Sequence, residues 1–415
     1  MSNEQNNQNM DPMGDGQGRS SGGIRATGAE LVSLVKSNVN DYAMYIALVV
    51  LFIFFGISSK GTFLKARNLS DLINQTGYVA TIAIGMTVIL IIKHIDLSVG
   101  YVAGFLGAIA AIMMKDGWSP LLVIPAVMAF GILIGFYQGY LVAQIGVPAF
   151  VVTLAGMFIF RGLLSLVTGS TGTIIIKSEG FKALSTGFVP SLVTIHGIHV
   201  LTLAIGVLAV ILVIISQIKS RRNMQKYNFK VVSTPIFALK LIFFSVIIMV
   251  IMWVLAGYNG LPWTAVIMVA VLFIYNFMLN KTRLGRYIYG IGGNAEAAEL
   301  SGVNVKKITL FSFCSVSMLA ALGGILYTSR IGAASPQAGL GFELDAIASS
   351  YIGGVSVNGG IGKVTNTIIG AFVIISMTNG MNSMGVNISY QYIFKGLILI
   401  LAVAFDVKTR GKRNV

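Results

Sequence analysis

The chain has 415 residues, of which 55% are hydrophobic and only 10% charged, and its mean hydropathy is +0.83. Soluble domains carry about 25% charged residues, so this composition excludes an ordinary soluble globular domain. The formal net charge is +15, but the basic residues gather in short loops, as they do in membrane proteins. Membrane orientation explains the charge better than a nucleic-acid partner does.

The chain is predicted to consist of one membrane domain between two polar tails. Residues 1–41 are rich in Asn, Gln, Gly and Ser and lack the apolar core of a signal peptide, so we expect a disordered cytoplasmic tail. Residues 42–407 are expected to form the membrane domain, which includes a cytoplasmic loop at 281–307. Residues 408–415 are expected to form a basic cytoplasmic tail.

Uncharged runs near the length of a spanning helix, about 20 residues, recur along the domain. They predict an all-α, polytopic protein with about 10–12 membrane helices, some of them short or broken. We place twelve membrane segments at 42–57, 76–93, 97–114, 119–145, 147–168, 198–218, 236–257, 262–280, 308–328, 342–357, 364–382 and 391–406. With the amino terminus inside, an even number of spans places the basic carboxyl-terminal tail in the cytoplasm as well.

The same count puts the three strongly basic regions in the cytoplasm, as the positive-inside rule requires. These regions contain Lys219, Arg221, Arg222, Lys226 and Lys230; Lys281, Arg283 and Arg286; and Lys408, Arg410, Lys412 and Arg413. A moderately polar loop at 169–197 is then expected on the outside.

Three segments are unusual as membrane spans. The stretch 94–100 joins two apolar runs without a real loop, and 342–357 is short and contains two acids. The uncharged run 119–145 is too long for an upright span, so it must tilt, bend or break. Irregular backbone at membrane depth is tolerated only where it is buried in protein or lines a wet cavity. Broken helices of this kind often mark a transport pathway.

Glycines inside the spans recur at intervals of four residues, which permits helices to approach closely. The spacing is seen at Gly100 and Gly104, and again at Gly131, Gly135 and Gly139. Packing within one chain is the simpler interpretation, and a subunit interface is the alternative.

The most conspicuous polar interruption is the segment 292–307. Asn294 is a good helix N-cap, the residues from Ala295 to Leu300 are mostly strong helix formers, and Gly302 is a natural helix stop. A helix of this length is only ~10 Å long and is marginal alone in water. We therefore expect it to pack against something.

Local motifs exclude the common enzyme classes. Gly362-Lys363 resembles the end of a phosphate-binding loop, but Val357 and Val364 replace the required Gly and Ser or Thr. The segment 290–295 satisfies a dinucleotide-binding pattern without the required strand–turn–helix context. His94, His196 and His199 provide no metal-ligand set. We predict no catalytic residue, metal site or bound cofactor in this chain.

Ionisable residues at membrane depth have two interpretations each. Asp96 either caps the helix expected to start at Leu97, alone or paired with Lys93, or belongs to a gate or substrate path. Glu343 and Asp345 either cap or face an interface, or line a polar translocation cavity.

Arg161 lies late in the 147–168 span. It either extends to the outer surface, with its aliphatic stem along the apolar helix, or pairs with one of the buried carboxylates.

Several motifs together resemble the permease subunits of bacterial ABC importers for monosaccharides. They are Ile95-Asp-Leu-Ser-Val-Gly100, Gly146-Val-Pro-Ala-Phe-Val-Val-Thr-Leu-Ala-Gly156, Arg283-Leu-Gly-Arg-Tyr-Ile-Tyr-Gly-Ile-Gly-Gly-Asn294, Glu296-Ala-Ala-Glu-Leu-Ser-Gly-Val-Asn304 and Glu343-Leu-Asp-Ala-Ile-Ala348. The resemblance runs in order from about residue 62 to 406. The extra pair of hydrophobic segments at 198–257 makes the chain longer than the ribose type and similar to the xylose type.

This resemblance implies a type II ABC importer-like permease in the bacterial cytoplasmic (inner) membrane. Two copies would pair beneath an extracytoplasmic sugar-binding protein. A cytoplasmic ABC ATPase, fused into one chain in many such systems, would bind ATP and Mg²⁺ and dock from below. The docking, or coupling, residues would be Gly293, Asn294, Ala295, Glu296, Ala297, Ala298, Leu300, Ser301, Gly302, Val303 and Asn304.

The resemblance also implies a sugar path that involves Asp96, Ser98, Glu343 and Asp345, with Arg161 as a further candidate. The substrate would be a pentose or a hexose. The alternatives are a related importer for another solute, such as a branched-chain amino acid or an autoinducer-like sugar, and an ion-coupled secondary transporter.

Overall fold

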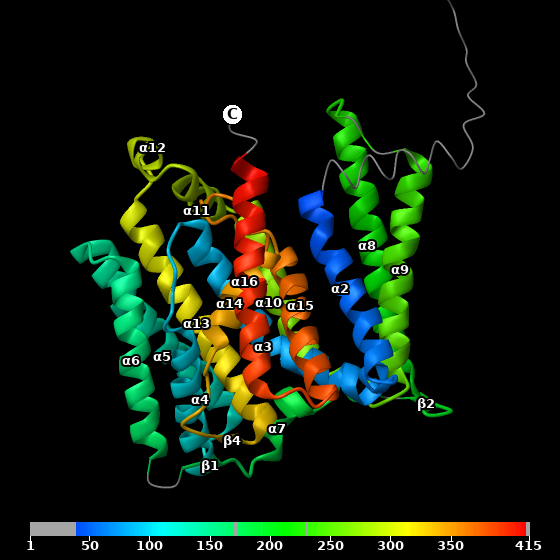
Figure 1. Cartoon of the computed structure of the whole chain (residues 1–415), viewed down its shortest axis with the longest axis horizontal. Coiled ribbons are helices and arrows are strands. Elements are labelled where there is room, and N and C mark those ends of the chain that lie inside the picture. Colours follow the sequence, from blue (N-terminus) through cyan, green and yellow to red (C-terminus); the bar gives the residue numbers. More distant parts are fainter. Residues whose placement is uncertain (1–38, 170–171, 192, 230, 232, 412–415) are drawn as a thin grey trace, which may run out of the picture.

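The computed structural model describes residues 39–411, apart from 170–171, 192, 230 and 232, and this part of the chain is almost entirely helical (Figure 1). In chain order the helices are α2 Val39–Ser58, α3 Ala66–Ile91, α4 Val99–Lys115, α5 Pro120–Tyr140, α6 Ala149–Thr168, α7 Glu179–Thr186, α8 Val200–Lys226, α9 Thr234–Ala256, α10 Trp263–Lys281, α11 Arg283–Gly293, α12 Ala295–Leu300, α13 Val305–Ile331, α14 Phe342–Ile352, α15 Val364–Ser383 and α16 Ile388–Gly411.

Each of the twelve predicted segments overlaps one of these helices. Within the described residues, nine helices are long and apolar enough to cross a membrane, and α2 and α4 contain shorter apolar helical stretches. The prediction of an all-α polytopic membrane protein is therefore confirmed. Residues 1–38, most of the first predicted tail, and 412–415, half of the second, lie outside the described residues, and α16 already includes 408–411.

The unusual spans take the irregular forms that the sequence suggested. In the run 119–145, α5 contains Pro125 and passes into a π-helical turn at Leu141–Ile145, which Gly146 ends at a φ of +86°. In the segment 342–357 only the 11 residues of α14 are helical. At 1.5 Å per residue α14 is ~16 Å long, about half of the hydrocarbon core.

The two faces of the bundle carry different elements (Figure 1). The helices α11 and α12, the start of α2, the end of α16, the end of α8 and the start of α9 lie on one face, which we call the α12 face. The opposite face, the α7 face, carries α7 and two short antiparallel pairs. One pair joins β1 (Ile174–Ile175) to β4 (Ala333–Ala334), and the other joins β2 (Thr194–Ile195) to β3 (Ile198–His199).

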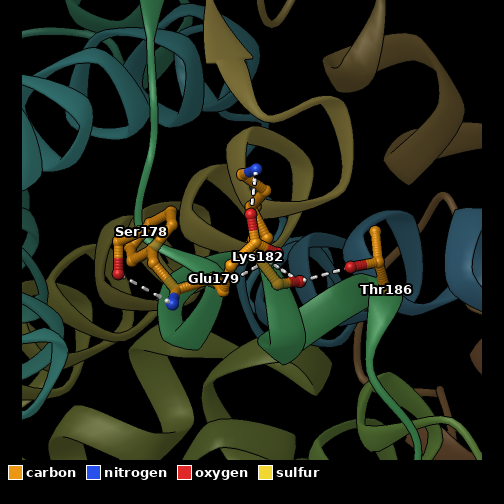
Figure 2. Close-up of polar contacts among 6 residues, drawn as sticks. Ser178, Glu179, Lys182 and Thr186 are labelled. Atoms are coloured by element: carbon orange, nitrogen blue, oxygen red, sulfur yellow. Dashed lines mark hydrogen bonds and ion pairs between the residues drawn. The ribbon is translucent and has the colours of Figure 1, made fainter.

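Helix α7 lies within the 169–197 loop and is fixed by local polar contacts (Figure 2). The Ser178 side chain caps it by accepting a hydrogen bond of 3.3 Å from the Phe181 N–H. Glu179 forms an ion pair of 2.7 Å with Lys182, whose carbonyl accepts a bond of 2.9 Å from the Thr186 hydroxyl. The sequence predicted this loop without its helix.

The centre of the bundle is α13, which packs against α3, α4 and α5. The glycines of α5 face it directly, because a Cβ on Gly131 would lie 2.7 Å from the Ser317 carbonyl oxygen and one on Gly139 would lie 2.9 Å from the Phe313 Cβ. Glycine spacing on α5 thus serves packing within the chain, which is the simpler of the two interpretations.

Helices α8 and α9 form a hairpin that stands apart from the bundle (Figure 1). They pack chiefly against each other, and only 11% and 6% of the residues in their most apolar stretches are buried. The hairpin is tied to the bundle on the α7 face, where the Thr202 hydroxyl accepts a hydrogen bond of 3.2 Å from the Leu261 N–H. This hairpin is the extra pair of hydrophobic segments noted in the sequence.

Candidate functional site

The polar segment 292–307 folds as the sequence predicts. The Asn294 Oδ1 accepts a hydrogen bond of 3.0 Å from the Ala297 N–H at the start of α12. After Leu300 the chain turns at Gly302, whose φ is +83°. Helix, N-cap and stop are all confirmed.

Helix α12 offers an exposed surface on the α12 face. Among its residues only Ala298 is buried, whereas Leu300 is 85% exposed. A shallow hollow beside it is lined by Glu299, Gly302, Val303, Asn304, Val305 and Lys306. Helix α12 therefore presents an exposed apolar side chain, Leu300, on a helix too short to be stable alone.

Helix α11 precedes α12 and was not predicted as a helix. The Thr282 side chain caps it by accepting a hydrogen bond of 3.3 Å from the Gly285 N–H, and Ile288 and Ile291 are buried on one side. The helical spacing of Leu284, Ile288 and Ile291 after a Thr was the signal that could have found it.

Helix α11 packs against the end of α3 and the loop between α14 and α15. Gly292 lies against the Ile91 carbonyl and the Gly360 backbone, with no room for a Cβ. The Gly360 N–H donates a hydrogen bond of 2.8 Å to the Ile91 carbonyl. The Tyr289 hydroxyl donates one of 2.7 Å to the Gly362 carbonyl. We call this contact of α11, α3 and the loop the Gly292 joint.

Burial raises the pKa of the Tyr289 hydroxyl above its usual range. The hydroxyl therefore stays protonated at neutral pH, as its role as a donor to the Gly362 carbonyl requires.

Between α3 and α4, residues 92–98 form an irregular connection with a turn at Lys93, whose φ is +65°. The Thr153 hydroxyl donates a hydrogen bond of 3.2 Å to the Ile95 carbonyl. The fully buried Asp96 accepts bonds from the Ser98 N–H at 2.8 Å and from the Ser98 hydroxyl at 2.6 Å. The Ser98 hydroxyl in turn accepts a bond of 2.9 Å from the Gln138 side chain.

The Asp96 carboxylate closes the turn just before α4 but is not the N-cap of that helix, which is Ser98. The capping interpretation needs two further corrections. The helix begins at Val99 rather than Leu97. Lys93 does not pair with Asp96, because its ammonium donates a hydrogen bond of 3.2 Å to the Gly293 carbonyl of the Gly292 joint. The second carboxylate oxygen, Oδ2, is buried without a hydrogen-bond partner among the described residues, so a role in the path stays a prediction.

The structure brings the start of α14 against the start of α4. The Glu343 carboxylate contacts Gly100, and Gly339 contacts the Gly100 carbonyl, so that neither glycine has room for a side chain. The Glu343 Oε2 is buried without a hydrogen-bond partner among the described residues. Two of the regions predicted for the path, 95–100 and 343–345, are therefore neighbours.

Asp345 has a partner that the sequence reasoning missed. The Lys395 ammonium of α16 lies 2.8 Å from the Asp345 Oδ1 and 2.9 Å from its Oδ2. Both side chains are largely buried. The available signal was Lys395 itself, a lone charge in an apolar run, which is costly in a membrane unless it is paired.

Arg161 is not part of this cluster. It is exposed on α6, and its guanidinium lies 5.8 Å from the centre of the Tyr101 ring. It makes no ion pair with a carboxylate in the described part of the chain, so the ion-pair alternative is wrong.

Helix α14 is thus held from several sides. The Asp345–Lys395 ion pair attaches its first turn to α16. The Asp406 carboxylate, near the other end of α16, accepts a hydrogen bond of 3.3 Å from the Val357 N–H in the loop after α14. The same loop forms the Gly292 joint, so α11 and α14 are connected through a few backbone contacts.

Comparison with known proteins identifies the family of the chain. The family model described as the permease component of branched-chain amino acid transport systems matches residues 68–215 and 180–403. The chain belongs to this permease family. No solved structure matches it with significance.

Several permeases of named transport systems are similar over almost the whole chain. The xylose transport system permease protein XylH of Haemophilus influenzae is 38% identical over 391 residues, which covers 92% of this chain and all of the relative. XylH of Escherichia coli K12 is 36% identical over 91% of this chain and 94% of its own length. The ribose import permease protein RbsC of Haemophilus influenzae is 33% identical over 87% of this chain and 91% of its own length.

The permease should not tolerate a side chain at the Gly292 joint. Gly292→Ala places a methyl group against the Ile91 carbonyl and Gly360, and overpacking of this kind costs about 1–3 kcal/mol. We expect a lower melting temperature of the purified protein and loss of transport in membrane vesicles. Gly290→Ala on the same helix meets no atom within 4 Å and is the matched control. Equal melting temperatures and equal transport of the two variants would contradict the close packing of Gly292 at this joint.

The Asp345–Lys395 pair should show strong coupling in a double-mutant cycle. Removing one partner leaves a buried charge unpaired, so we expect Lys395→Met and Asp345→Asn each to cost about 3–5 kcal/mol of unfolding free energy. The double variant should cost much less than their sum.

The exposed Glu179–Lys182 pair of α7 (Figure 2) is the reference for this cycle. Glu179→Gln should cost less than about 1 kcal/mol. Additive effects at positions 345 and 395, measured by thermal unfolding, would contradict the buried pair.

Proposed function

We propose that the chain is the permease subunit of an ATP-driven importer that carries a monosaccharide, a pentose or a hexose, across the bacterial cytoplasmic membrane. The observation that carries this proposal is the similarity, over nine tenths of the chain, to permeases named for xylose transport. A soluble binding protein outside the membrane would deliver the sugar.

The exposed α12 surface is the proposed docking site for the ATPase. Its residues are the coupling residues between Gly293 and Asn304, and the exposed Leu300 is the apolar contact that a partner would bury. The ATPase, whether two chains or one fused chain, would bind ATP and Mg²⁺. This assignment makes the α12 face cytoplasmic, which agrees with the basic ends of α8 and α10 on that face.

Two copies of the permease would enclose the sugar path. Asp96 and Glu343 each keep a buried carboxylate oxygen without a hydrogen-bond partner among the described residues. Sugar hydroxyls are neutral donors that suit such oxygens, and contacts of this kind are weak enough for the ligand to leave. Ser98 supports Asp96 through its two hydrogen bonds, Asp345 lies on the same helix as Glu343 and pairs with Lys395, and Arg161 lies outside this cluster.

The Gly292 joint supports a simple coupling scheme. ATP-driven closure of the ATPase would move α12 and α11. Through the joint, the loop after α14 would move with them, as a rigid-body displacement about the interface. Because α14 carries Glu343 and Asp345, the displacement would reach the proposed path.

The alternative substrate is a branched-chain amino acid, which the description of the matching family favours, or an autoinducer-like sugar. Reconstitution discriminates among them. Proteoliposomes that contain the permease and its copurifying ATPase and binding protein should accumulate radiolabelled xylose or ribose when ATP is enclosed. Accumulation of leucine instead of either sugar would overturn the sugar assignment, and uptake without ATPase would overturn the ATP-driven mechanism.

Leu300→Asp should uncouple the permease from its ATPase. The substitution puts a charge where a partner would bury an apolar side chain, so we expect at least ~10-fold loss of ATPase copurification and of ATP-dependent uptake. Ile195→Asp alters an exposed apolar residue on the α7 face, 54% exposed, and should leave the ATPase bound. Normal copurification with Leu300→Asp would show that α12 is not the docking surface.

A further inference from the structure

Helix α8 extends beyond the apolar part of the membrane on the α12 face. Its 27 residues span about 40 Å, whereas the hydrocarbon core is about 30 Å thick. The last two turns of α8 therefore reach the headgroup region. They contain Lys219, Arg221, Arg222 and Lys226.

Three of these basic residues form one exposed row. Lys219, Arg222 and Lys226 follow one another at spacings of three and four residues, so they share one face of the helix. Like charges at these spacings repel each other. No Asp or Glu occurs between Glu179 and Glu296, so neither helix of the hairpin can supply a counter-charge.

The same face continues into the membrane as an apolar stripe. Leu208, Leu212 and Ile215 precede the basic row at the same helical spacing, and each is more than half exposed. The face is thus apolar at membrane depth and cationic at the membrane surface. This arrangement is complementary to a phospholipid with acyl chains and an anionic headgroup.

Arg221 has a different role from its neighbours. It is half-buried, its Nη2 donates a hydrogen bond of 3.1 Å to the Thr234 hydroxyl of α9, and its guanidinium lies 4.5 Å from the centre of the Phe237 ring. It attaches the end of α8 to α9 and so fixes the direction of the exposed row.

Protein occupants suit this face less well. A second copy of the same hairpin would bring the same uncompensated positive charge. The α12 surface proposed for the ATPase lies at the far side of the molecule from the α8–α9 hairpin (Figure 1). An anionic lipid meets both the charge and the apolar stripe.

We propose that the exposed face of α8 from Leu208 to Lys226 binds an anionic phospholipid. Its phosphate lies among Lys219, Arg222 and Lys226, and its acyl chains lie along the apolar stripe. The α8–α9 hairpin thereby anchors the permease to anionic lipid.

The test compares lipid retention by purified variants. The permease is exchanged into nanodiscs that contain phosphatidylglycerol and phosphatidylcholine, then extracted in detergent, and its bound lipids are counted by native mass spectrometry. Wild-type protein should retain phosphatidylglycerol in preference to phosphatidylcholine. Each basic residue at a membrane surface strengthens anionic-lipid binding several-fold, so K219Q/R222Q/K226Q should lower this preference ~10-fold or more.

Two controls make the result specific. K219R/R222K/K226R keeps the charges and should keep the preference. K65Q/R67Q/K115Q removes three exposed basic residues of the α7 face and should also keep it.

The proposal is overturned if the K219Q/R222Q/K226Q variant retains phosphatidylglycerol like the wild type, or if both Gln variants lose it equally. Equal melting temperatures of the variants in phosphatidylcholine alone show that lost retention is not unfolding. The assay uses neither ATP nor sugar, so its outcome is independent of the transport proposal.

Discussion

The backbone hydrogen bond from the Gly360 N–H to the Ile91 carbonyl, 2.8 Å long, joins the end of α3 to the loop after α14. Gly292 of α11 seats on this bond because it has no side chain. Buried backbone groups must be satisfied within the protein, so the joint cannot loosen without cost. The surface that faces the proposed ATPase is therefore attached to the half-length helix that carries Glu343 and Asp345.

The remaining irregular parts of the bundle also need partners inside the protein for their buried polar groups. The irregular segment 92–98 and the short helix α14 interrupt the predicted spans, and each finds some of its polar partners inside the protein. Asp96 is satisfied in part by Ser98, and Asp345 by Lys395. The peripheral α8–α9 hairpin has no such interruption, and it contains no acidic residue that could pair with its basic end. The irregular segments thus belong to the bundle that carries the proposed path, whereas the α8–α9 hairpin is a regular, lipid-facing element at its periphery.

Much of the fold could be predicted from sequence because it follows from local signals. Apolar runs gave the spans, and Asn294 and Gly302 delimited α12 correctly. What could not be predicted were contacts between distant segments. Lys395 lies in an apolar run, and nothing nearby identifies Asp345 as its partner. Gly292 was one of many glycines in a polar loop, and its importance depends on Ile91 and Gly360, which are remote in sequence.

The central claim is that α11 moves together with the end of α3 during transport. Cysteines replace Lys93 and Gly293, whose ammonium and carbonyl are 3.2 Å apart, in a Cys314→Ser background. They are then joined by a short, cleavable bifunctional thiol reagent in reconstituted proteoliposomes. The account predicts that ATP-driven uptake continues with the cross-link in place. Uptake that stops on cross-linking and returns when the linker is cleaved would contradict it.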